Sequence, residues 1–95
     1  MAIMTRAQWQ TLRDKHGVKK GAARVSMGGA FEAFHNAKGL KAQIKAAEDL
    51  KKAIKNYLGT VKQPDITREL NEQVQKQIDP LIDLAKTELA LKKGL

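Results

Sequence analysis

The sequence contains no cysteine, only two histidines and only four aromatic residues among its 95 positions. Without cysteine the chain has no disulfide framework, no thiolate metal site and no cysteine nucleophile. Two histidines are too few for a metal centre built from several imidazole ligands. No stretch reaches the roughly 18 apolar residues of a membrane span, and residues 1–10 lack the apolar run of a signal peptide. We therefore expect a soluble cytoplasmic protein that uses no metal or other cofactor and does not bind membranes.

Charge is plentiful and unevenly distributed. The chain has 18 Lys and Arg against 10 Asp and Glu, which gives a formal net charge of +8. Residues 1–62 hold 13 of the basic and 4 of the acidic residues, whereas residues 63–95 hold 5 and 6. A positive surplus confined to one part of a chain is typical of a surface that meets an anionic partner. From its length and its 42% of hydrophobic residues, we expect residues 1–95 to form a single domain.

Apolar residues recur at helical spacing along most of the chain, and no segment alternates with the period of two that marks a strand. The pattern predicts an all-α fold, a small bundle of about four helices. The first helix covers residues 5–16, with a capping box formed by Thr5 and Gln8 and a left-handed residue at Gly17. The second ends before Gly39, and its start stays open between about residues 22 and 28. The third covers residues 40–58.

The long C-terminal helix begins with Asp65 or Thr67 as its cap. Its apolar stripe continues through Asp79-Pro80 to the end of the chain. Asp followed by Pro is a strong helix start, because proline is favoured at the first helical position. An unbroken stripe instead favours a single helix kinked at Pro80, where one backbone hydrogen bond is lost. Both interpretations stay open at this point.

The four aromatic residues fall on three of the expected helices, which suggests that they meet in the core. The C-terminal helix carries more leucine than one buried stripe requires, which predicts that it takes part in a homo-oligomer. The residues expected at that oligomer interface are Leu81, Leu84, Leu89 and Leu91.

Residue groups that carry catalysis are sparse. The only serine is Ser26, and nothing in the spacing of His16 or His35 links either of them to it. Glu48 and Asp49 are adjacent on a helix and point about 100° apart. We expect structural roles for both histidines and a protein that is not an enzyme.

The strongest candidate for function is a basic, glycine-containing segment between residues 13 and 29. Backbone N–H groups that glycine leaves accessible, next to Lys and Arg, suit phosphate oxygens. The segment lacks the Gly-Lys-Ser/Thr of a P-loop, so the signal is one of composition. The residues expected to bind the anion are Arg13, Lys15, Lys19, Lys20, Arg24, Ser26, Gly28 and Gly29.

Two other interpretations compete for the same segment. Residues 12–25 have the order of a helix-turn-helix unit, although Gly21 is a weak residue within a recognition helix. Gly28 and Gly29 also suit a close helix crossing in place of a ligand nest. A second basic face is expected on the third helix, at Lys41, Lys45 and Lys52.

The partner implied by these residues is nucleic acid or a phosphorylated small molecule, contacted by charge more than by base recognition. The competing hypothesis is a helical protein–protein interaction module, an assembly component or an inhibitor. Such a module would use its apolar C-terminal helix or dock on an acidic protein.

Overall fold

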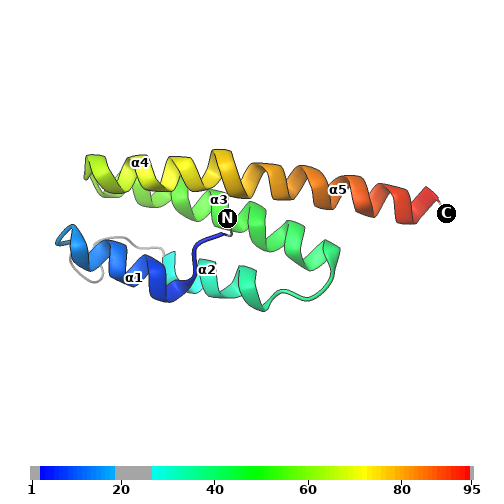
Figure 1. The fold of residues 1–95 in the computed structure, drawn as a ribbon, viewed down its shortest axis with the longest axis horizontal. Helices are drawn as coiled ribbons and strands as arrows, with labels where there is room; N and C mark the ends of the chain where they lie inside the picture. The colour runs from blue at the N-terminus through cyan, green and yellow to red at the C-terminus, as the bar shows by residue number, and fades with distance from the viewer. Residues whose placement is uncertain (1–2, 19–26, 95) are drawn as a thin grey trace.

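The computed structural model describes residues 3–18 and 27–94. Within these ranges the chain is helical and contains no strand, which confirms the all-α prediction. The elements are α1 (Arg6–Lys15), α2 (Met27–Asn36), α3 (Leu40–Thr60), α4 (Pro64–Gln73), a π-helical segment η1 (Val74–Ile78) and α5 (Asp79–Gly94). Helices α1 and α2 lie side by side below the pair formed by α3 and the C-terminal helix (Figure 1).

Helix α1 begins and ends as its sequence predicts. The Thr5 hydroxyl accepts from the Gln8 backbone N–H, and the Gln8 side chain accepts from the Thr5 backbone N–H. At the other end Gly17 has a φ of 70°, and the Val18 N–H donates to the Arg13 carbonyl at 3.1 Å. This 6→1 bond is the mark of a Schellman motif, which ends the helix and folds Val18 back onto the core.

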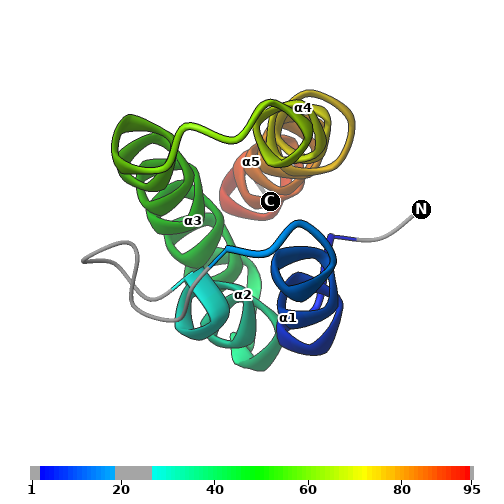
Figure 2. The same cartoon turned by 90° about the vertical axis from the view of Figure 1, so that its left-hand side faces the viewer.

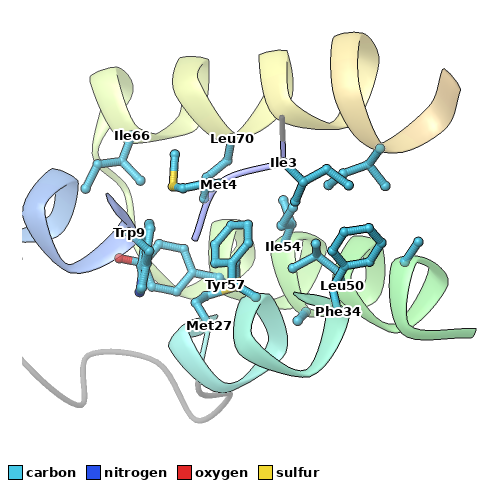
Figure 3. Packing of buried hydrophobic residues seen from close by; sticks show 14 of the residues in the cluster. Ile3, Met4, Trp9, Met27, Phe34, Leu50, Ile54, Tyr57, Ile66 and Leu70 are labelled. Carbon is cyan, nitrogen blue, oxygen red and sulfur yellow. The ribbon is translucent and has the colours of Figure 1, made fainter. Parts of the chain in front are cut away.

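The four aromatic residues meet in the core, as expected. The Trp9 ring lies edge-on to Tyr57 with ring centroids 4.9 Å apart, and it lies 6.1 Å from Phe31. Figure 3 shows Trp9 beside Tyr57, with Phe34 further along the same layer. Because α1, α2 and α3 each contribute a ring, this cluster holds three helices together.

The segment before α1 is part of the core, which the sequence did not indicate. Ile3 and Met4 are buried between the lower helices and α4 (Figure 3). The Met4 N–H donates to the side-chain oxygen of Gln73, and His35 Nε2 lies 3.1 Å from the Ile3 carbonyl and 3.0 Å from the Met4 carbonyl. The structural role expected for His35 is therefore to hold this segment in place.

The C-terminal helix is continuous. Elements α4, η1 and α5 together form one helix of 31 residues with a bend, so the interpretation as a single bent helix is confirmed. The turn before Pro80 is π-helical, and the Asp79 N–H donates to the Val74 carbonyl, five residues back. A wider turn gives the proline ring room where an α-helical carbonyl would clash with it.

Three boundaries differ from prediction. Helix α2 ends at Asn36, and Gly39, with a φ of 88°, precedes α3 as its N-cap. Helix α3 continues through Gly59 to Thr60. The cap of α4 is neither Asp65 nor Thr67 but Gln63, whose side chain accepts from the Ile66 N–H, because Pro64 occupies the first helical position.

Candidate anion-binding surface

The structure tests only part of the basic segment. Lys19, Lys20, Arg24 and Ser26 lie outside the described residues, as does much of the expected helix-turn-helix unit. Lys15 is exposed on the last turn of α1. Arg13 is largely covered: its side chain is 17% exposed, and its Nε lies 4.0 Å from Asp14 Oδ1. Arg13 therefore points into the protein and is poorly placed for a partner in solution.

Gly28 lies in a helix contact. It is buried in the first turn of α2, where an added Cβ would stand 3.3 Å from the Arg6 side chain of α1. Arg6 in turn pairs with Glu32 of α2. This arrangement favours the close approach of helices over a ligand nest at Gly28.

Burial also sets the chemistry of Tyr57. Its hydroxyl is buried without a hydrogen-bond partner, and so is Arg13 Nε. Desolvation raises the pKa of Tyr57 above its ordinary value of 10.0, and the positive charge of Arg13 offsets part of that rise. Arg13 therefore favours the ionised form of the Tyr57 hydroxyl, but burial outweighs this effect.

The second basic face is well formed. Lys41, Lys45 and Lys52 are exposed on α3, and Lys55 joins them. At 100° per residue these four lysines fall within a sector of about 80°, opposite the buried side of the helix, and they span about 21 Å of its axis. None of the four makes an ion pair within the described residues. We call this set of four residues the α3 lysine face.

Two carboxylates near the α3 lysine face take part in ion pairs between α3 and α5. Glu48, which lies in the middle of the same sector, has its carboxylate 3.8 Å from Lys86. Asp79 at the start of α5 lies 2.6 Å from Lys51, which stands about 40° outside the sector. These two ion pairs connect α3 to α5, and Lys86 partly neutralises Glu48, which lies among the lysines of the face.

The groove beside this face has mixed charge. It runs between α3 and the C-terminal helix, with a volume of about 740 Å³. Lys52 and Lys55 stand on its α3 side, and Asp83 stands on its α5 side. We therefore expect an anion to bind on the outer surface of α3 and not in the groove.

The predicted leucine interface divides into two pairs. Leu81 and Leu89 are half-buried, and Leu81 packs against the core. Leu84 and Leu91 are 63% and 65% exposed. Seven residues separate these two, so they lie on one face of α5, away from α3.

His16 lies at the end of α1, as expected for a structural residue. Its Nδ1 lies 3.7 Å from an oxygen of Asp65, close to the start of α4. The same carboxylate lies 3.3 Å from Arg68. His16 therefore takes part in the contact between these two helix ends.

In residues 3–18 and 27–94 no three His, Asp or Glu side chains gather as a metal site would require. None of the described helices is both long enough and apolar enough to cross a membrane. Comparison with family models, curated proteins and solved structures finds no match.

Proposed function

We propose that the protein is a non-catalytic binder of nucleic acid that contacts the phosphate backbone through the α3 lysine face. The observation that supports it is the set of four exposed lysines within one sector of α3, with Glu48 turned to Lys86. Lysine suits this task because an ammonium group acts as a point charge towards phosphate.

The aromatic residues favour backbone contact over base recognition. All four aromatic side chains of the sequence lie in the core, so none is free to stack on an unpaired base. Proteins that bind single strands commonly use exposed aromatic rings for such stacking. The proposed ligand is therefore a duplex, bound with little regard to sequence.

Salt dependence tests the proposal. Four neutralised phosphates of duplex DNA should give a slope of log K against log salt of about −3.6, or roughly a hundredfold loss of affinity between 50 and 200 mM salt. The double variant Lys52→Ala/Lys55→Ala should lower the slope to about −1.8. Fluorescence anisotropy with a labelled 20-base-pair duplex carrying 5′-hydroxyl ends measures both values.

A matched control removes two positive charges elsewhere. Arg68→Ala/Lys76→Ala changes the net charge by the same amount on α4 and η1, and its slope should stay close to that of the unmodified protein. Equal slopes for both double variants would show that only net charge matters. A duplex that does not bind at 50 mM salt would refute the proposal.

The second candidate function is self-association through α5. It is favoured by the exposure of Leu84 and Leu91 on one face of a helix that belongs to the almost neutral segment, residues 63–95. Two copies that met along this face would keep their α3 lysine faces apart. Light scattering at several concentrations tests it, and Leu84→Lys/Leu91→Lys should convert an oligomer to monomer; a monomer at every concentration would exclude it.

A further inference from the structure

A hollow lies at the opposite end of the molecule from the α3–α4 connection. It has a volume of about 400 Å³ and lies where the α2–α3 connection meets the second half of α5. Figure 1 shows this end of the bundle, with the beginning of α3 below α5. The hollow is lined by Lys38, Gly39, Leu40, Lys41, Ala42, Leu89 and Lys92.

The charge of this lining is of one sign. Lys38 comes from the connection, Lys41 from the first turn of α3 and Lys92 from the last turns of α5. No Asp or Glu lines the hollow, and none of the three lysines makes an ion pair within the described ranges. This contrasts with the larger groove, where carboxylates and lysines are mixed.

The backbone adds donors at the same place. Gly39 is the N-cap of α3 and provides no side chain to accept from the first N–H groups of the helix. Those groups belong to Leu40, Lys41 and Ala42, which line the hollow. The positive end of the helix dipole therefore adds to the charge of the lysines.

We propose that this hollow binds a phosphate monoester group. Such a group carries a charge of about −1.5 to −2 at neutral pH and three strong acceptor oxygens, whereas each internal phosphate of a nucleic acid carries one negative charge. Three ammonium groups around one hollow match the greater charge. Lys41 belongs to both the hollow and the α3 lysine face, so a 5′-phosphate at a duplex end is one source of the group. This source depends on the proposed function; a free phosphorylated small molecule is the other.

The first experiment uses inorganic phosphate alone. The ¹⁵N-labelled full chain is titrated at constant ionic strength, and the amide signals of residues 39–42 should shift and saturate. Lys38→Ala/Lys92→Ala should abolish the saturation, whereas Lys52→Ala/Lys55→Ala, with the same change in net charge, should preserve it. Shifts that do not saturate, or that spread evenly over all surface lysines, would overturn the proposal.

The second experiment distinguishes the two sources. Two duplexes of identical sequence, one with 5′-phosphate and one with 5′-hydroxyl ends, are compared by anisotropy with the unmodified protein. A duplex source predicts about fivefold tighter binding of the phosphorylated form, since each exposed pair of charges contributes modestly. Lys38→Ala/Lys92→Ala should remove that preference, and Lys52→Ala/Lys55→Ala should weaken both duplexes alike.

The outcomes separate this inference from the proposed function. Saturable phosphate binding without a preference between duplexes supports the hollow and assigns it to a small molecule. Binding of both duplexes alike, with no saturation by phosphate, overturns the hollow and leaves the proposed function standing. If neither duplex binds, the proposed function fails and the phosphate titration alone decides the hollow.

Discussion

Helices α3 and α5 pack on each other and use their outer surfaces in opposite ways. Helix α3 buries six residues and presents lysines to solvent, whereas α5 buries only Ile82 and Ala85 and presents Leu84 and Leu91. The reason is position: α3 packs against α2 on one side and against α5 on another, whereas the main contacts of α5 are with α3 and η1 (Figure 2). A helix with two packed neighbours buries more apolar residues, and here its exposed side carries lysines, while α5 leaves two leucines uncovered.

The largest expected effect contrasts leucines on these two helices. Leu50 of α3 is fully buried, so Leu50→Ala should lower the free energy of unfolding by about 3–5 kcal/mol through lost burial and a residual cavity. Leu84→Ala on α5 should change it by less than about 0.5 kcal/mol, because the side chain is already exposed. Urea denaturation measures both. Equal losses would contradict the distinction between a central and a peripheral helix.

A smaller effect concerns Tyr57, the polar residue that α3 buries. The pKa of Tyr57 is higher in the folded protein than in the unfolded chain. The stability that comes from keeping this hydroxyl neutral is therefore fully present below about pH 10, and it is lost as the pH rises through the pKa of the folded state. Tyr57→Phe should remove this alkaline loss. At pH 7 it should leave stability unchanged or increase it by up to about 1 kcal/mol, because the hydroxyl is buried without a partner.

Thermal unfolding followed at pH 7 and at several values above pH 10 provides the measurement for Tyr57. The unmodified chain should lose stability over this interval more steeply than the variant. Parallel curves for the two proteins would show that the tyrosine hydroxyl is not buried in the folded state.

The smallest effect concerns the ion pairs between α3 and α5. Lys51→Ala breaks the pair with Asp79, and since both side chains are more than 40% exposed the expected loss is a few tenths of a kcal/mol. That loss should nearly disappear in 1 M salt, where charges are screened within about 3 Å. Lys52→Ala, the neighbouring unpaired lysine, is the control and should show no loss. A salt-independent loss for Lys51→Ala would indicate packing in place of charge.

Features that depend on neighbouring residues were predictable from the sequence. The capping box at Thr5 and the glycine turn at Gly17 follow from bonds that span three to five positions. The boundaries at Asn36 and Thr60 were less accurate, because they depend on which turns the tertiary packing supports.

The candidate site was less predictable than the fold. Helical spacing alone places Lys41, Lys45 and Lys52 on one face of α3, so the sequence was enough to predict this basic face. The burial of Arg13 and the contact of Gly28 with Arg6 do not follow from it. Both depend on how α1 packs against α2 and, through Trp9, against Tyr57 of α3, and a count of charges along the chain contains no such information.

The order of the residues by itself determined where helices form and which side of each is apolar, because backbone hydrogen bonds and side-chain periodicity act within one or two turns. Only the tertiary structure decided which charges remain available. Glu48 meets Lys86, and Lys92 comes to the same hollow as Lys38, because α5 returns along α3 from more than thirty positions away. Charge acts through space, so the positive surface belongs to the packed bundle and not to any single segment.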